Sequence, residues 1–175
     1  MDKPSVSPAI RMVWLRKYIF FILTIVWMII IFMFSNSSGD ESGEISRGVG
    51  GLFCKIFVPG YEEMVVVEQE ELALLLDYPI RKFAHFMEYM ILGVLMIGIP
   101  QFTVKSDYWK RGLIVWGFAC LYAISDEVHQ LFVPGRCGAL KDVLLDSVGA
   151  SVGVFLGLLM VRWVTVLKSK IANKG

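Results

Sequence analysis

The apolar residues of this chain gather in four long runs that are separated by polar segments. The runs cover residues 13–34, about 86–104, about 112–133 and about 143–167, and the first reads VWLRKYIFFILTIVWMIIIFMF. A helix needs roughly 20 mostly apolar residues to cross a bilayer, and each run reaches or approaches that length. The pattern therefore predicts an all-α, polytopic membrane protein with four transmembrane helices.

The polar segments divide the chain around these four spans. Residues 1–12 form a short segment before the first span, residues 13–167 form one membrane domain, and residues 168–175 form a tail. The first apolar run is longer than the 7–15 residues of a signal-peptide core and is rich in bulky side chains. We therefore expect it to be an uncleaved membrane anchor.

The segment from Ser35 to Lys82, between the first two spans, is too long for a plain connector. Ser38 and Glu41 have the spacing of a capping box, in which a hydroxyl and a carboxylate begin a helix. A second short helix is predicted at about 68–76. The apolar stripe of the first helix favours a sub-domain that packs over the bundle, and the alternative is a lid or a wall in contact with lipid. The stripe consists of Ile45, Val49, Leu52, Phe53, Ile56 and Phe57.

Composition and charge add an orientation to this picture. Hydrophobic residues make up 56% of the 175 residues, above the 45–50% of a typical soluble domain. The net charge of +1 gives no indication of nucleic-acid binding. If both termini are cytoplasmic, 11 of the 17 basic residues lie at or near the inner ends of the spans and 6 lie outside. Because lysine and arginine favour the cytoplasmic side, we predict cytoplasmic termini and an extracytoplasmic helical segment between spans one and two.

Polar residues recur at the predicted outer ends of three spans. Their spacing places several members of each group on one helix face. A charge at membrane depth costs about 2.5–3.5 kcal/mol on insertion scales, so Asp126 should face the bundle interior. Its expected partners are Arg136, Arg81 and Lys82. The candidate pocket comprises Lys82, His85, Tyr89, Asp126, Glu127, Gln130, Arg136, Asp142 and Asp146.

Small residues follow this cluster along the fourth predicted span. Gly149, Gly153 and Gly157 form a GxxxGxxxG stripe. Small residues let the backbones of two membrane helices approach closely. We therefore expect a tight helix crossing beneath the polar residues.

Three pieces of the sequence resemble the VanZ-like family, which takes its name from the teicoplanin-resistance protein VanZ. They are FSNSSG after the first span, RKFAHFMEYMILG at the start of the second, and SDEVHQLFVPGRCGALKDVLLDSVGASVG between the third and fourth. The likeness extends over roughly residues 13–165, although members often have Gln where this chain has Ser37. The positions that match are Lys82, His85, Phe86, Tyr89, Asp126, Glu127, Gln130, Arg136, Asp142 and Gly149.

The resemblance implies a small multi-pass protein of the bacterial cell membrane. Some members confer low-level teicoplanin resistance, and other envelope roles are open to such domains. The resemblance supplies no established reaction, so no catalytic residue is carried over.

Three interpretations of the polar cluster are open. In the first, an outward-facing pocket binds a lipid headgroup or a lipid-linked cell-wall precursor, with Arg and Lys meeting phosphate. In the second, a membrane hydrolase or transferase acts on a lipid headgroup, with His85 or Glu127 as general base or with a divalent cation held by acids and histidines. In the third, the charges pair only to fix the helix register.

The sequence lacks the motifs of several well-known enzyme and metal-binding classes. Walker A, GxSxG and HExxH motifs are absent, and the three cysteines show no metal-binding spacing. We therefore assign no metal and leave any cofactor unknown. The expected partners are membrane lipids, with a lipid-linked cell-wall precursor as a candidate and no nucleic acid, and assembly into an oligomer is left open.

Overall fold

The structure, a computed structural model, describes residues 8–99 and 108–173. These residues form five α-helices and one short 3-10 helix, and they contain no strand. The all-α prediction is thus confirmed. The elements are α1 (Pro8–Ser35), α2 (Gly39–Phe57), η1 (Tyr61–Glu63), α3 (Val66–Gly98), α4 (Tyr108–Gln130) and α5 (Leu140–Ala172).

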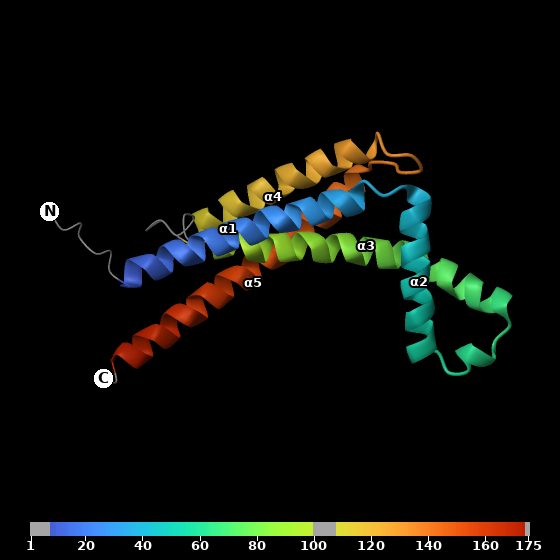
Figure 1. Ribbon diagram of the computed structural model, residues 1–175, viewed down its shortest axis with the longest axis horizontal. Helices are drawn as coiled ribbons and strands as arrows, with labels where there is room; N and C mark the ends of the chain where they lie inside the picture. Colours follow the sequence, from blue (N-terminus) through green and yellow to red (C-terminus); the bar gives the residue numbers. More distant parts are fainter. Residues whose placement is uncertain (1–7, 100–107, 174–175) are drawn as a thin grey trace.

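Four long helices form a bundle, and the remaining helix lies across one end of it (Figure 1). In the bundle, α3 makes its most extensive contacts with α5, and it also contacts α1 and α4. The crossing helix, α2, packs on α3. The N-terminal end of α1 and the C-terminal end of α5 both lie away from α2. The last part of α5 diverges from its neighbours (Figure 1).

The start of α2 forms as the sequence predicts. The Ser38 hydroxyl accepts a hydrogen bond from the Glu41 amide at 3.2 Å, and the Glu41 carboxylate accepts one from the Ser38 amide at 2.9 Å. This reciprocal pair is the predicted capping box, which satisfies two amides that a helix start otherwise leaves unbonded. The helix ends at Phe57, and Gly60 then turns the chain with a φ of 77°.

The predicted short helix at 68–76 is not a separate element. It is the first part of α3, which continues through Pro79 into the second predicted span. Proline removes one backbone hydrogen bond from a helix interior, here the one to the carbonyl of Leu75. Leu75 is among the most exposed apolar residues, so its carbonyl can be solvated, which lowers the cost of an uninterrupted helix.

The apolar stripe of α2 faces away from the rest of the chain. Its six residues are 49–65% exposed. The face that packs on α3 is made instead of small residues, namely Gly43, Ser46, Gly50 and Cys54. The prediction that the stripe itself packs over the bundle is therefore wrong, although α2 does cover the bundle end (Figure 1).

Close contact between α3 and α5 occurs along the glycine stripe of α5. Gly149 lies against the carbonyl oxygen of Phe86, and Gly153 lies against that of Met90, so neither position has room for a Cβ atom. A Cβ atom at Gly157 would lie 2.9 Å from a side-chain carbon of α3. Glycine at these positions permits the close approach of the two backbones.

Hydrogen bonds from aromatic side chains fix α1 to the bundle. The indole nitrogen of Trp27 donates to the carbonyl of Glu88 in α3 at 2.9 Å. The hydroxyl of Tyr122 in α4 donates to the carbonyl of Met28 at 2.7 Å. Around these bonds the buried core consists of Ile31, Tyr89, Leu92, Ala119, Ala123 and Ala150.

The outward surfaces of the bundle are strongly apolar. Large apolar side chains are exposed along α1, α4 and α5, including Phe21, Ile22, Leu113, Phe118, Leu121, Phe155 and Trp163. Soluble monomers rarely expose apolar patches larger than a few hundred Å². Among the described residues, Lys17–Ser35 and Leu140–Ile171 are each long and apolar enough to cross a membrane.

These two segments correspond to the first and fourth predicted spans. The second and third spans stay predictions, and the end of the second, residues 100–104, lies outside the described residues. So do Lys3, Lys105 and Lys174, which contribute to the predicted orientation, as well as residues 1–7 and 174–175 of the two terminal segments.

Candidate functional site

The nine residues of the candidate pocket lie on α3, α4, α5 and the segment between α4 and α5, toward the bundle end that α2 covers (Figure 1). Lys82, His85 and Arg136 are partly buried. The other six side chains are buried, each with 8% exposure or less: Tyr89, Asp126, Glu127, Gln130, Asp142 and Asp146. The cluster is thus an interior feature of the bundle end.

One ion pair within the cluster connects two helices. The Lys82 ammonium of α3 lies 2.6 Å from a carboxylate oxygen of Asp142 in α5. His85, one turn further along α3, has its Nδ1 atom 3.8 Å from the Glu88 carboxylate. That distance is too long for a hydrogen bond, and the His85 Nδ1 atom has no hydrogen-bond partner in the described structure.

Glu127 binds the start of the neighbouring helix. One of its carboxylate oxygens accepts a hydrogen bond from the amide of Ala139, the residue that precedes α5, at 2.9 Å. In a capping box this amide would be bound by the acid three residues further on. Here that acid is Asp142, which pairs with Lys82 instead. A carboxylate from α4 therefore completes the start of α5.

Arg136 binds backbone carbonyls at the end of α1, and it forms no ion pair with an acid among the described residues. Its Nε atom donates to the carbonyl of Ser37 and its Nη2 atom to the carbonyl of Phe34, each at 3.0 Å. Helix ends leave carbonyls without partners, and a cation near them is also favoured by the helix dipole. Burial, followed by the nearby charge of Arg81, lowers the pKa of Arg136 from its ordinary value.

A backbone contact joins the same two segments. The amide of Gly39, at the start of α2, donates to the carbonyl of Pro134 at 3.1 Å. A side chain on Gly39 would collide with the backbone of Gly135, which itself has a φ of 72°. The SNSSG segment (residues 35–39) and the VPGR segment (residues 133–136) are therefore held together by this backbone contact and by the hydrogen bonds of Arg136.

The interior acid Asp126 lacks the cationic partner that the sequence led us to expect. It is buried, and one of its carboxylate oxygens accepts a hydrogen bond from the side-chain amide of Gln130 at 3.4 Å. Its other carboxylate oxygen has no hydrogen-bond partner. The expected pairing with Arg136, Arg81 or Lys82 is wrong. Arg136 binds the carbonyl of Ser37, Arg81 pairs with Asp77, and Lys82 pairs with Asp142.

Asp146 and Tyr89 are the most deeply placed polar groups of the cluster. Both have 0% exposure. Neither carboxylate oxygen of Asp146 has a hydrogen-bond partner in the described structure, and neither does the Tyr89 hydroxyl. Four other acids lie within electrostatic reach of Asp146, namely Glu127, Asp126, Glu88 and Asp142. The centre of the cluster is therefore rich in acceptor oxygen atoms and poor in cations.

Sequence reasoning left three contributors out of the candidate pocket. Glu88 lies within electrostatic reach of Asp126 and Asp146. Ser35, at the end of α1, is buried beside Asp126 with its hydroxyl unbonded. The side-chain oxygen of Asn36 accepts a hydrogen bond from the Nε2 atom of the His129 ring at 3.2 Å. Ser35 and Asn36 belong to the FSNSSG segment, so the first apolar run and its polar end are part of the site.

The acids of the cluster are not arranged as a metal centre. Within residues 8–99 and 108–173, no three His, Cys, Asp or Glu side chains are placed to hold a metal ion. The chemical property that the arrangement does offer is a set of buried acceptors for hydrogen-bond donors.

Comparison with known protein families finds a match over most of the chain. The sequence model of the VanZ/LLP1 family matches residues 20–162 of this chain. No curated protein and no solved structure matches it.

Proposed function

The chain belongs to the VanZ/LLP1 family, and from this premise we propose that it is a bacterial cell-membrane protein that binds the headgroup of an envelope lipid. The binding site is the polar cluster, at the extracytoplasmic end of the bundle. In this arrangement α1, α3, α4 and α5 cross the bilayer, both termini are cytoplasmic, and α2 lies at the outer surface.

The shape of the bundle supports this membrane arrangement. Two of its helices meet the length and composition of a span, and α3 and α4 run alongside them (Figure 1). The remaining helix, α2, crosses the bundle with an exposed apolar stripe. A helix with one apolar and one polar face commonly lies in the plane of the membrane interface, which here places the polar cluster near the outer headgroups.

The observation that carries the proposed binding function is the set of buried oxygen atoms without partners. Asp126, Asp146 and Tyr89 contribute such atoms from three different helices. Each buried polar group left unbonded costs about 1–3 kcal/mol. A ligand that donates hydrogen bonds to these atoms would remove that cost, and the removed cost would contribute to its binding free energy. An ammonium group fits this requirement, because it carries both the donors and the opposite charge.

The cations of the cluster are already bound within the protein, which changes the expected ligand chemistry. The sequence suggested that Arg and Lys meet a phosphate, yet Lys82 binds Asp142 and Arg136 binds backbone carbonyls. We therefore propose an ammonium-bearing headgroup, carried by an amino-phospholipid or by a lipid-linked cell-wall precursor. Low-level teicoplanin tolerance would then depend on occupancy of this site by the precursor.

A purely structural role fits the cluster less well. Polar groups that only fix the helix register would be expected to bond to one another, because a buried polar group without a partner is destabilising. In the cluster, Asp142 has a cationic partner, whereas Asp126, Glu127 and Asp146 have none.

A titration with three lipids tests the proposal. The purified protein is titrated with phosphatidylethanolamine, phosphatidylcholine and phosphatidylglycerol of identical acyl chains, and bound lipid is counted by native mass spectrometry. Phosphatidylethanolamine should bind best, because its ammonium donates hydrogen bonds whereas the quaternary amine of phosphatidylcholine cannot.

Matched variants locate the binding. Asp146→Asn should weaken phosphatidylethanolamine binding about tenfold or more, since a hydrogen bond to a charged group contributes about 1.5–3 kcal/mol. Asp40→Asn, which changes an exposed acid on α2, should leave binding unchanged. Equal binding of the three lipids, or an Asp146→Asn variant that binds like wild type, would contradict the proposal. In cells, any teicoplanin tolerance should fall in the same variant at unchanged protein level.

A further inference from the structure

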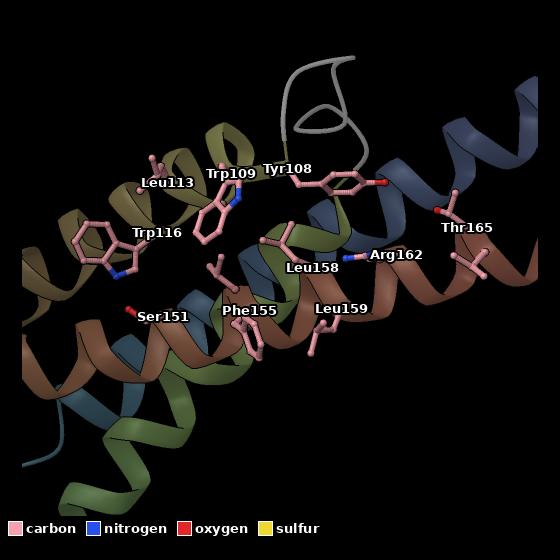
Figure 2. Close-up of a pocket in the computed structure, with 13 residues that line it drawn as sticks. Tyr108, Trp109, Leu113, Trp116, Ser151, Phe155, Leu158, Leu159, Arg162 and Thr165 are labelled. Atoms are coloured by element: carbon pink, nitrogen blue, oxygen red, sulfur yellow. The ribbon is translucent and has the colours of Figure 1, made fainter.

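A groove separates α4 from α5 at the bundle end away from the polar cluster. It has a volume of about 980 Å³ and is lined, among the described residues, by the first turns of α4 and by α5 from Ser151 to Val166. Figure 2 shows the side chains of Trp109, Leu113, Trp116 and Phe155 along it, with Tyr108 and Arg162 together toward one end. The last part of α5 diverges from the bundle at this end (Figure 1).

In the proposed membrane arrangement, the end of the groove that holds Arg162 lies at the cytoplasmic membrane surface, opposite the polar cluster. Arg162 follows the start of α5 by 22 residues, which is about 33 Å along a helix. The hydrocarbon core of a bilayer is about 30 Å thick. If α5 starts at the outer surface, Arg162 therefore lies at the inner headgroups. Tyr108 and Trp109 are at the same end, as aromatic side chains of a membrane interface commonly are.

The lining has the chemistry of a lipid in this position. Among the described residues that line the groove, most side chains are apolar, none is an acid, and Arg162 carries a charge. Within the described part of the chain Arg162 forms no ion pair. An arginine can bind a phosphate through two parallel hydrogen bonds. The distance along α5 from Ser151 to Val166 is about 22 Å, which gives an acyl chain an extended apolar surface.

We propose that the groove between α4 and α5 binds one anionic phospholipid of the cytoplasmic leaflet. The phosphate lies at Arg162, and an acyl chain runs along Leu113, Trp116 and Phe155. The inference rests on the proposed membrane arrangement, but it does not depend on the ligand of the polar cluster. It adds a second lipid site of opposite charge preference at the other membrane surface.

A charge series at Arg162 tests the headgroup contact. Wild type, Arg162→Gln and Arg162→Lys are titrated with phosphatidylglycerol and phosphatidylcholine of equal chain length, and lipid adducts are counted by native mass spectrometry. Wild type should prefer phosphatidylglycerol, Arg162→Gln should lose that preference by about tenfold, and Arg162→Lys should keep part of it. Lys170→Gln removes an exposed charge from the same helix outside the groove and should change nothing.

A steric pair tests the acyl-chain contact. A Cβ atom at Gly112 would lie 3.2 Å from Leu158 and 3.4 Å from Val154, both in the groove lining. Gly112→Leu should therefore reduce binding of both phospholipids. Gly117→Leu places the same side chain on the same helix where nothing lies within 4 Å, and it should bind lipid like wild type.

Three outcomes would overturn the inference. They are a phosphatidylglycerol preference that survives Arg162→Gln, lipid binding that survives Gly112→Leu, and a stable lipid-free dimer whose interface includes the groove. If Gly112→Leu does not fold, the Arg162 series decides alone. Asp146→Asn should leave groove binding intact, so failure of the outer site and failure of the groove are distinguishable.

Discussion

Gly93→Ala tests the close crossing of α3 and α5. An added Cβ atom would lie 2.7 Å from the carbonyl oxygen of Ala150 and 2.9 Å from the amide nitrogen of Val154. Ordinary contacts of this kind begin at 3.4 Å. Both atoms belong to the backbone of α5, so they cannot rotate out of the way. The helices would have to separate by roughly half an ångström, which a close-packed interior resists.

The size of the effect follows from two opposing terms. Overpacking costs about 1–3 kcal/mol, whereas replacing glycine by alanine inside a helix gains up to about 1 kcal/mol. Gly117→Ala isolates the second term, because nothing lies within 4 Å of a Cβ atom there. Relative to this control, Gly93→Ala should lower the free energy of unfolding by about 1–3 kcal/mol, or the melting temperature by roughly 2–12 °C for a chain of this size.

The assay is thermal unfolding of both variants in one detergent, followed by circular dichroism, and repeated in nanodiscs. Gly117→Ala should melt at or above the wild-type temperature, and Gly93→Ala below it. If the two variants melt together, the backbones of α3 and α5 are not in the close contact described, and the glycine stripe has another role.

Two further predictions concern the ion pair and the topology. In a double-mutant cycle measured by thermal melting, Lys82→Met and Asp142→Asn should each destabilise the protein. The double variant should be destabilised by about 1 kcal/mol less than the sum of the two single effects. Additive effects would show that the pair contributes no coupling energy. In a cysteine-free background, a membrane-impermeant maleimide applied to intact cells should label a cysteine at Asp40 and spare one at Lys170, and the reverse pattern would invert the orientation.

Features that depend on local geometry were predictable from the sequence. The spacing of Ser38 and Glu41 determines which amide each side chain can reach, and the capping box forms accordingly. The same holds for helix content, because apolar runs of this length have few other ways to satisfy their backbone hydrogen bonds. The continuity of α3 was missed since Pro79 normally ends a helix, and an exposed position reduces that penalty.

Partner choice among the charged residues was not predictable. Helical spacing brings Asp126 and the cations to one end of the bundle, but several pairings are compatible with it. The choice is made by the turn around Gly135, whose backbone conformation directs Arg136 to the carbonyls at the end of α1. Such a contact joins residues about 100 positions apart, and no local pattern indicates it. The exposed face of α2 was missed for a related reason, because periodicity identifies an apolar face without identifying what covers it.

The two proposed sites differ in which helices build them, and this follows from where α5 is held. Its glycine stripe, from Gly149 to Gly157, fixes the first half of α5 against α3. Beyond the stripe the helix diverges (Figure 1), and the described residues that line the groove, from Ser151 onward in α5, belong to α4 and α5. Asp146 and Arg162 lie on opposite sides of this contact, about 24 Å apart along the helix, so the two ligands do not compete for space. A change that separates α3 from α5 should therefore weaken headgroup binding at the outer cluster, whose members lie on both helices, while leaving the inner groove able to hold its lipid.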